Sequence, residues 1–249
     1  LSNKSRDLLS VVIPAYNEEQ FLPLTLCSLI SSLKQCEEIE DYEIIVADNH
    51  STDKTAEIAA KFGAKVVLET EHKISKVRNT GAKNTNGTYI VFLDADTIVK
   101  SSTLRQAYQA LTLETGYGGG ALVRFDDNFG KFILGKFIPS FWNWCSKTFR
   151  LAAGSFIFCK KEDFLQVGGF PESMYAGEEI EFVRKLKKIN KKSSKEFLII
   201  EEPPVITSSR KLIWYSSWKI FLQLVMILIF PFSVRFRRLC GFWYVRPKN

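Results

Sequence analysis

The motif Asp94-Ala95-Asp96 contains the side chains of this sequence with the clearest chemical potential. It follows directly on the apolar run Tyr89–Leu93, which predicts a buried strand. On an extended backbone, residues two apart point to the same side, so we expect both carboxylates to face one hard cation, Mg²⁺ or Mn²⁺, held against a diphosphate. Aspartates at a strand end also serve as turn or capping residues, and the motif alone leaves that alternative open.

A second acidic group, Glu178, Glu179 and Glu181, follows Gly177 at the start of a predicted helix. Carboxylates are favoured in a first turn because the helix N-terminus carries partial positive charge. A reaction that activates a hydroxyl also needs a general base, and no histidine follows His72. We therefore expect this group to supply the base.

Alternating strands and helices are predicted to position these residues. Short β-branched or apolar runs predict strands at 9–13, 42–47, 65–68 and 89–93. Helical spacing predicts a helix capped by Asn17 with apolar residues up to Leu33, and further helices at 51–62 and 76–85. This order predicts an α/β fold with a doubly wound, mostly parallel, Rossmann-like sheet. Ligands of such sheets bind at the carboxyl ends of the strands, where Asp48 and the Asp94 motif fall.

The second half of the chain is less regular. The glycine-rich stretch 116–120 is interpreted as a flexible turn, and 131–149 as an aromatic-rich segment. Further elements are expected as strands at 121–125 and 155–159 and helices at 161–167 and 178–189, with a basic surface run ending at Lys195.

Six motifs occur in a characteristic order. They are 10–19 (SVVIPAYNEE), 47–53 (ADNHSTD), 78–81 (RNTG), 94–96 (DAD), 168–170 (GGF) and 177–181 (GEEIE). In this order they resemble glycosyltransferase family 2, over about residues 9–210. The resemblance implies a GT-A fold, a divalent cation (Mn or Mg), and inverting transfer of a sugar from a UDP- or GDP-linked donor. The implied acceptor is a hydroxyl or phosphate of a polysaccharide, a glycolipid or a polyprenyl phosphate.

The same resemblance implies roles for individual residues. Its nucleotide-binding set corresponds to Pro14, Ala15, Tyr16, Glu18, Asp48, Arg78, Asp94 and Ala95. Asp48 would accept from the imino group of the base, and Arg78 would close over the nucleotide. Asp96 would bind the metal directly, and Asp94 would face the ribose or the metal. Helix capping by Tyr16 and Glu18, and a helix-initiating turn at Asp48, remain as alternatives.

The general base is implied to be Glu179, where the family usually has an aspartate, with Glu178 as the second candidate. Gly154 and Arg210 are assigned to the acceptor or the diphosphate, since an arginine beside Ser208 and Ser209 could neutralise a phosphate. For Arg210, a basic residue beside a membrane is the alternative.

Charge divides the chain unevenly. The net charge is +7, yet after Glu202 there are eight basic residues and no acidic one. A near-neutral body argues against nucleic-acid binding, and a basic tail favours an anionic membrane surface. The apolar run 220–232 would form a helix of roughly 20 Å, shorter than the ~30 Å hydrocarbon core. We expect a transferase domain at 1–210 and a tail at 211–249 that lies on the membrane, with packing against protein as the alternative.

The expected location is the cytosolic face of the membrane. Five scattered cysteines indicate a reducing compartment, and the N-terminal residues lack the pattern of a secretory signal. The glycines at 116–120 do not form a phosphate-binding or dinucleotide fingerprint. Two rival functions remain open, a sugar nucleotidyltransferase and a catalytically degenerate nucleotide-sugar-binding scaffold. No oligomeric state is predicted.

Overall fold

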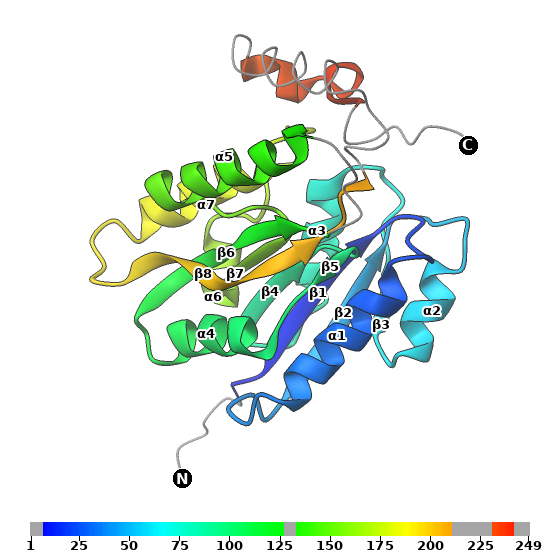
Figure 1. The fold of residues 1–249 in the computed structure, drawn as a ribbon, viewed down its shortest axis with the longest axis horizontal. Helices are drawn as coiled ribbons and strands as arrows, with labels where there is room; N and C mark the ends of the chain where they lie inside the picture. Colours follow the sequence, from blue (N-terminus) through cyan, green and yellow to red (C-terminus); the bar gives the residue numbers. More distant parts are fainter. Residues whose placement is uncertain (1–6, 127–132, 211–230, 242–249) are drawn as a thin grey trace.

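The computed structural model describes residues 7–126, 133–210 and 231–241. In this part of the chain the strands form one eight-stranded sheet with the order β3-β2-β1-β4-β7-β6-β8-β5 (Figure 1). The strands are β1 Leu9–Ala15, β2 Tyr42–Asp48, β3 Lys65–Leu68, β4 Tyr89–Leu93, β5 Thr97–Ile98, β6 Gly116–Phe125, β7 Phe156–Lys160 and β8 Glu196–Thr207. The helices are α1 Leu22–Lys34, α2 Thr55–Lys61, α3 Ile74–Lys83, α4 Ser101–Thr112, α5 Ile133–Phe149, α6 Lys161–Gln166 and α7 Glu178–Ile189, followed by the 3₁₀ turns η2 Pro231–Arg235 and η3 Arg237–Cys240.

Strand direction confirms the predicted fold class. β1 is parallel to β2 and β4, β2 is parallel to β3, and β6 is parallel to β8. Antiparallel pairs join β4 to β7, β6 to β7 and β5 to β8. The N-terminal half is therefore a Rossmann-like unit with helical crossovers, and the antiparallel strand β7 joins it to the C-terminal half.

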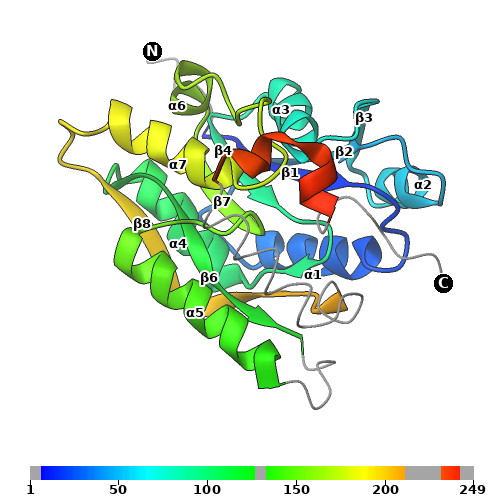
Figure 2. The same cartoon turned by 90° about the horizontal axis from the view of Figure 1, so that it is seen from above.

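Helices cover both faces of the sheet (Figure 2). One core contains the odd-numbered residues of β1 with apolar residues of α1 and α4. The other contains Val12 with residues of α3, α6 and α7, including a cluster of Phe92, Phe164, Phe170 and Phe182. The central strands are buried on both faces, which explains why their sequences are continuously apolar rather than alternating.

The interpretation of residues 116–120 as a flexible turn is wrong, because these glycines form the first half of β6. A Cβ added at Gly119 would lie 2.2 Å from the carbonyl oxygen of Leu198, and one at Gly120 would lie 2.5 Å from Ala152. The glycines allow close packing against strand β8 and against the segment before β7, and do not form a turn.

Two further differences concern element limits. Asn17 does not cap α1, which begins at Leu22 after an uncapped Phe21. Instead, Asn17 has a left-handed backbone (φ 52°) and its side-chain oxygen accepts a hydrogen bond from the Thr52 N–H at 2.8 Å. The long strand β8 was not predicted, because charged residues and two prolines at 201–204 interrupt its apolar pattern.

The end of the described chain packs on the body. Val234 and Cys240 lie against Ala176, and the N–H of Tyr175 donates to the carbonyl of Val234 at 2.6 Å. The predicted apolar run 220–232 lies mostly outside the described residues. Among the helices in the described ranges, none combines the length and the apolarity needed for a membrane span.

Candidate active site

The carboxyl ends of β1, β2 and β4 bring the predicted residues to one edge of the sheet. The register pairs Ala15 with Asp48, and β4 delivers Asp94 beside β1. Pro14 and Ala15 are the last residues of β1 and are buried. The main-chain hydrogen bonds of the sheet therefore hold these strand ends next to one another.

Asp48 has an unused acceptor. Asp48 is 5% exposed, and its Oδ2 accepts a hydrogen bond from the N–H of Ser51 at 3.2 Å. Its Oδ1 is buried and has no hydrogen-bond partner among the described residues. The turn interpretation explains the hydrogen bond to Oδ2 of Asp48. Oδ1 can still accept a hydrogen bond, for example from the imino group of a base.

The loop after β1 is tied to the loop after β2. The N–H of Asn17 donates to Ser51 Oγ at 2.9 Å, and the N–H of Glu18 donates to Thr55 Oγ1 at 2.7 Å. Tyr16 makes an edge contact with the ring of His72, with centroids 4.8 Å apart. These contacts hold Tyr16 and Glu18 next to Asp48.

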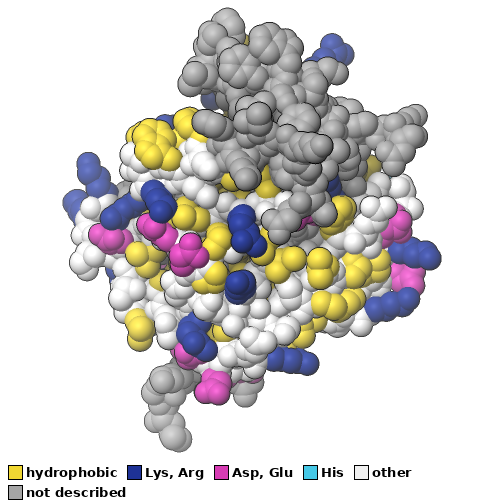
Figure 3. Space-filling model, viewed as in Figure 1, with side chains coloured by type: hydrophobic (Ala, Val, Ile, Leu, Met, Phe, Trp, Pro, Cys, Tyr) yellow, Lys and Arg dark blue, Asp and Glu magenta, His cyan; other side chains and the backbone are white. Residues whose placement is uncertain are grey.

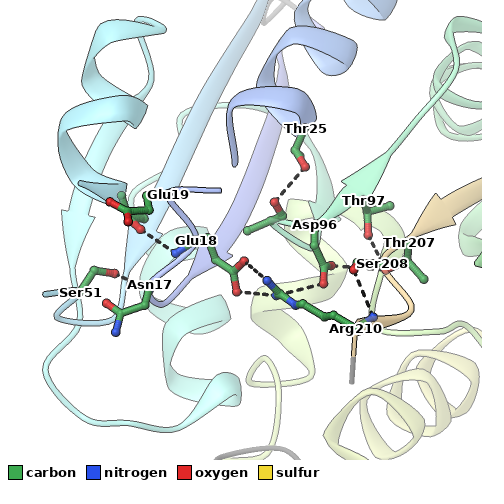
Figure 4. A network of polar contacts seen from close by, with 12 residues as sticks. Asn17, Glu18, Glu19, Thr25, Ser51, Asp96, Thr97, Thr207, Ser208 and Arg210 are labelled. Atoms are coloured by element: carbon green, nitrogen blue, oxygen red, sulfur yellow. Dashed lines mark hydrogen bonds and ion pairs between the residues drawn. The ribbon is translucent and has the colours of Figure 1, made fainter. Parts of the chain in front are cut away.

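The Asp94 motif does not continue as an extended strand. The N–H of Thr97 donates to the carbonyl of Asp94 at 3.1 Å, so the chain turns, while the buried Ala95 accepts from Thr25 Oγ1 at 2.8 Å (Figure 4). The premise that the motif continues as an extended strand is therefore wrong. Asp94 pairs with Arg78 at 3.0 Å, and Asp96 pairs with Arg210 at 3.0 Å.

Arg210 joins two carboxylates. Its guanidinium makes two hydrogen bonds of 2.6 Å to Glu18, besides the contact with Asp96, and stacks over the ring of Phe21 at 4.4 Å. Figure 4 shows Glu18 and Asp96 approaching this guanidinium from two sides. The two carboxylates thus converge on one place that accommodates positive charge.

The residues present fit a divalent cation that is completed by a substrate. The described residues contain no group of three or more His, Cys, Asp or Glu side chains that could hold a metal ion. Mg²⁺ and Mn²⁺ sites at phosphates often use only one or two carboxylates together with phosphate oxygens and water. Asp96, with Glu18 close to it, meets that requirement.

Arg78 is buried and surrounded by protein groups. Its side chain is 4% exposed and donates to Glu178 at 2.7 Å, to Asp94 at 3.0 Å and to the carbonyl of Gly154 at 3.2 Å. A Cβ at Gly154 would lie 2.7 Å from this guanidinium. In the structure, Arg78 and Gly154 thus position carboxylates, and their predicted contacts with nucleotide, diphosphate or acceptor remain predictions.

Glu178 and Glu179 differ in environment. Both start α7 after Gly177, which has a left-handed backbone (φ 71°). Glu178 is buried and forms an ion pair with Arg78. Glu179 is half-buried, and its burial, together with the negative charge of Glu178, raises its pKa to about 8, although the positive charge of Arg78 acts in the opposite direction. A carboxylate with a raised pKa is a stronger base, so the geometry favours Glu179 over Glu178 as the group that takes a proton.

Comparison with known proteins adds the family. The family model described as glycosyl transferase family 2 matches residues 10–167. The chain belongs to this family. The fold agrees, because solved glycosyltransferases share it: the mannosyltransferase PcManGT from Pyrobaculum calidifontis has a TM-score of 0.66 at 20% identity, over 92% of this chain and 64% of that one. Glucosyl-3-phosphoglycerate synthase from Mycobacterium tuberculosis has a TM-score of 0.63 at 18% identity, over 99% and 83%. The expected GT-A fold is confirmed.

Relatives in sequence are similar over shorter stretches. The uncharacterized glycosyltransferase EpsJ of Bacillus subtilis is 33% identical over 112 residues, 43% of this chain and 30% of that protein. The poly(ribitol-phosphate) beta-N-acetylglucosaminyltransferase TarS of Staphylococcus aureus is 32% identical over 104 residues, 39% and 18%. An undecaprenyl-phosphate 4-deoxy-4-formamido-L-arabinose transferase of Photorhabdus laumondii is 36% identical over 94 residues, 35% and 28%. The matched stretches span less than a third of the length of each of these three relatives.

Sequence reasoning missed one contact of the Asp94 motif and one buried cation. The end of β8 contacts the motif, since Thr207 Oγ1 donates to Asp96 at 3.3 Å and the N–H of Ser208 donates to its carbonyl at 3.2 Å. The β-branched run Val205-Ile206-Thr207 was the available signal for that strand end. Lys73, a buried cation at the start of α3, carried no signal that distinguishes it from a surface lysine.

Proposed function

We propose that this chain transfers a sugar from a UDP- or GDP-linked donor to a hydroxyl or phosphate acceptor, with inversion at the anomeric carbon. The observation that carries the proposal is the meeting of an unused acceptor on Asp48, the Asp94 motif and the basic carboxylate Glu179 at one edge of a family 2 fold. The first suits a nucleoside, the second a diphosphate, and the third an acceptor hydroxyl.

The donor would lie across the carboxyl ends of β1, β2 and β4. Asp48 Oδ1 accepts from the base, with Tyr16 beside it, and the diphosphate extends towards Asp94 and Asp96. A divalent cation bound by Asp96 would stabilise the negative charge that develops on the leaving diphosphate. Arg210 lies at the same place and neutralises the diphosphate further.

Transfer would then need one proton acceptor. Glu179 takes the proton of the acceptor hydroxyl, and the oxygen attacks the anomeric carbon while the bond from that carbon to the diphosphate oxygen breaks. Glu179 ends protonated and the nucleoside diphosphate leaves with the bonding electrons. Arg78 contributes by holding Asp94 and Glu178, the neighbour of the base, in fixed positions.

Solved and curated relatives support the substrate classes. PcManGT was solved with GDP-Man and Mn²⁺, and TarS with UDP-GlcNAc. The relatives named above include one that acts on poly(ribitol-phosphate) and one that acts on undecaprenyl phosphate. A lipid or polymer that carries phosphate is therefore within the range of acceptors we propose for this chain.

We also propose that the chain works at the cytosolic surface of a membrane, with a transferase domain at 1–210 and a membrane-contacting tail at 211–249. The segment 231–241 supports this, because it exposes Phe232, Phe236 and Leu239 together with three arginines and contains no acidic residue. Exposed aromatics beside arginines suit the interface of an anionic bilayer.

Product analysis tests the proposed function. Purified protein is incubated with UDP- and GDP-sugars and Mn²⁺, with Glu179→Gln as the matched control. Release of a nucleoside diphosphate that depends on Glu179 is expected. Release of pyrophosphate from a sugar phosphate and a nucleoside triphosphate would identify a nucleotidyltransferase instead, and donor binding without any turnover would favour the scaffold.

A further inference from the structure

The start of α3 holds a buried cation without a carboxylate partner. Lys73 is 7% exposed, and no carboxylate lies within ion-pair distance of it among the described residues. Its Nζ lies 4.1 Å from the centroid of the Tyr175 ring. Burying an ammonium group is unfavourable unless it is paired, and a contact with an aromatic ring compensates only in part.

The helix start itself offers further donors. Lys73 occupies the N-cap of the ten-residue helix α3, its side chain does not cap the helix, and the first turn contains no acidic residue. Ser75 in this turn is fully buried, and its hydroxyl has no hydrogen-bond partner among the described residues. The first N–H groups of a helix have no intrahelical acceptor and mark the positive end of its dipole. An ammonium, a hydroxyl and such N–H groups are the kinds of donor that bind a phosphate, and here they lie within one helical turn of the chain.

This donor set lies between the two halves of the proposed site. β3 ends where Leu68 pairs with Asp48, and Asn49 Nδ2 ties the following loop by donating to the carbonyls of Glu69 and Glu71 at 2.7 and 2.9 Å. In that loop the ring of His72 touches Tyr16. Lys73 follows directly, so it adjoins the proposed nucleoside pocket.

On its other side Lys73 adjoins the loop of the proposed base. Tyr175, which lies under its ammonium group, precedes Gly177 by two residues, and α7 with Glu179 starts there. The segment 231–241 covers this loop through the hydrogen bond between Tyr175 and Val234, and Figure 2 shows η2 and η3 beside the start of α7. Lys73 therefore lies between the place for the base of the donor and the place for the transfer step.

We propose that Lys73, Ser75 and the uncapped start of α3 form a phosphate-binding subsite for a phosphate group of a substrate. This inference rests on the proposed function, which requires a donor diphosphate and allows an acceptor phosphate. Lys76, one helical turn after Lys73, is the natural comparison, because it pairs with Glu71 and Glu172 and so already has carboxylate partners.

Calorimetric titration with a nucleoside and its diphosphate tests the donor source. In Lys73→Met, affinity for UDP or GDP should fall about tenfold or more, while affinity for uridine or guanosine stays within about twofold, since only the diphosphate carries the charge. Lys73→Arg should retain most of the affinity, and the control Lys76→Met should behave as wild type. Circular dichroism and thermal melting verify that each variant is folded.

Kinetics with a short prenyl phosphate and the matching prenyl alcohol test the acceptor source. If nucleoside diphosphate binding is unchanged but the KM for the prenyl phosphate alone rises in Lys73→Met, the subsite binds the acceptor. The inference is overturned if Lys73→Met equals Lys76→Met in both experiments, or if it weakens the nucleoside as much as the diphosphate. If wild type binds neither diphosphate, the proposed function fails, and titration with inorganic phosphate then tests the subsite by itself. Phosphate binding by wild type that is lost in Lys73→Met would support the subsite. Equal phosphate binding by wild type and Lys73→Met would overturn it.

Discussion

Each aspartate of the central motif is held by its own arginine, Asp94 by Arg78 and Asp96 by Arg210. The two pairs differ in character. Arg78 is enclosed among protein groups, whereas Arg210 lies where Glu18 and Asp96 converge. We therefore assign the position of Asp94 mainly to the protein frame and regard Asp96 as the carboxylate that changes partner when a donor and cation bind.

The first prediction concerns Asp96. In Asp96→Asn, the gain in nucleoside diphosphate affinity on adding Mn²⁺ should disappear, because the charge that binds the cation is lost, while the fold remains. Titration calorimetry with and without Mn²⁺ measures this gain. An Asp96→Asn variant that is folded and keeps the full gain would remove Asp96 from the metal site.

The second prediction concerns Glu179. Glu179→Gln keeps the size of the side chain but cannot accept a proton, so kcat should fall about 100-fold or more with donor affinity nearly unchanged. Because the pKa of Glu179 is raised to about 8, the carboxyl is protonated and inactive as a base below that pH. The wild-type rate should therefore rise as the pH increases through about 8, and the residual rate of Glu179→Gln should lack this rise. A rate profile without this rise in wild type would exclude Glu179 as the base.

At the scale of elements, the buried ion pair of Arg78 joins α3, the end of β4 and the start of α7. These elements are far apart in sequence, and their meeting was not predictable from any local pattern. The sequence motif led instead to an expected contact between Arg78 and the nucleotide.

The third prediction separates these two roles of Arg78. Arg78→Met leaves Glu178 buried and unpaired, which should lower the free energy of unfolding by roughly 3–5 kcal/mol. The double variant Arg78→Met, Glu178→Gln should recover part of this loss in chemical denaturation, because the uncompensated charge is gone. Unchanged stability together with lost nucleotide affinity would instead support the contact with the nucleotide.

The predictable elements are those whose local pattern and tertiary role agree. β1, β2 and β4 are apolar because helices cover both faces of the sheet, and α7 has a clear amphipathic repeat. The long strand β8 was missed because charged residues and two prolines at 201–204 interrupt its apolar pattern. The glycines of β6 could not be assigned to a strand, because their pairing depends on close approach between distant segments. The turn within Asp94-Ala95-Asp96 was missed for the same reason, since contacts from Thr25 and Ser208 fix it.

At the scale of the molecule, the segment 231–241 combines basic and apolar side chains on its surface. Phe232, Phe236 and Leu239 are exposed beside Arg235, Arg237 and Arg238. Figure 3, viewed from one side, shows apolar and basic side chains distributed over the body as well. The concentration at 231–241 lies against the loop before α7, so a membrane bound there would be close to the proposed base.

The fourth prediction is that this end binds anionic membranes. Replacing the three arginines at 235, 237 and 238 by glutamine should weaken cosedimentation with anionic liposomes, since each basic residue near such a surface contributes about 1 kcal/mol. The matched control replaces Lys34, Lys61 and Lys83, which are exposed at the C-terminal ends of α1, α2 and α3.

Binding by wild type and by the lysine control should decrease at high salt, because salt screens the headgroups. Full-length protein that stays in the supernatant at low salt, or equal loss in both triple variants, would contradict a membrane role for this segment.

The central claim, a nucleotide-sugar site at the carboxyl edge of the sheet, is tested most directly by thermal stability in the presence of nucleoside diphosphates. Ligands that bind only the folded state raise its stability with the logarithm of their concentration above Kd. We expect UDP or GDP to raise the Tm of wild type, with a larger rise when Mn²⁺ is present. Asp48→Asn should reduce the rise, because an amide has a single acceptor oxygen and cannot accept from both the Ser51 N–H and the base. No rise with either diphosphate, with or without Mn²⁺, would contradict the account.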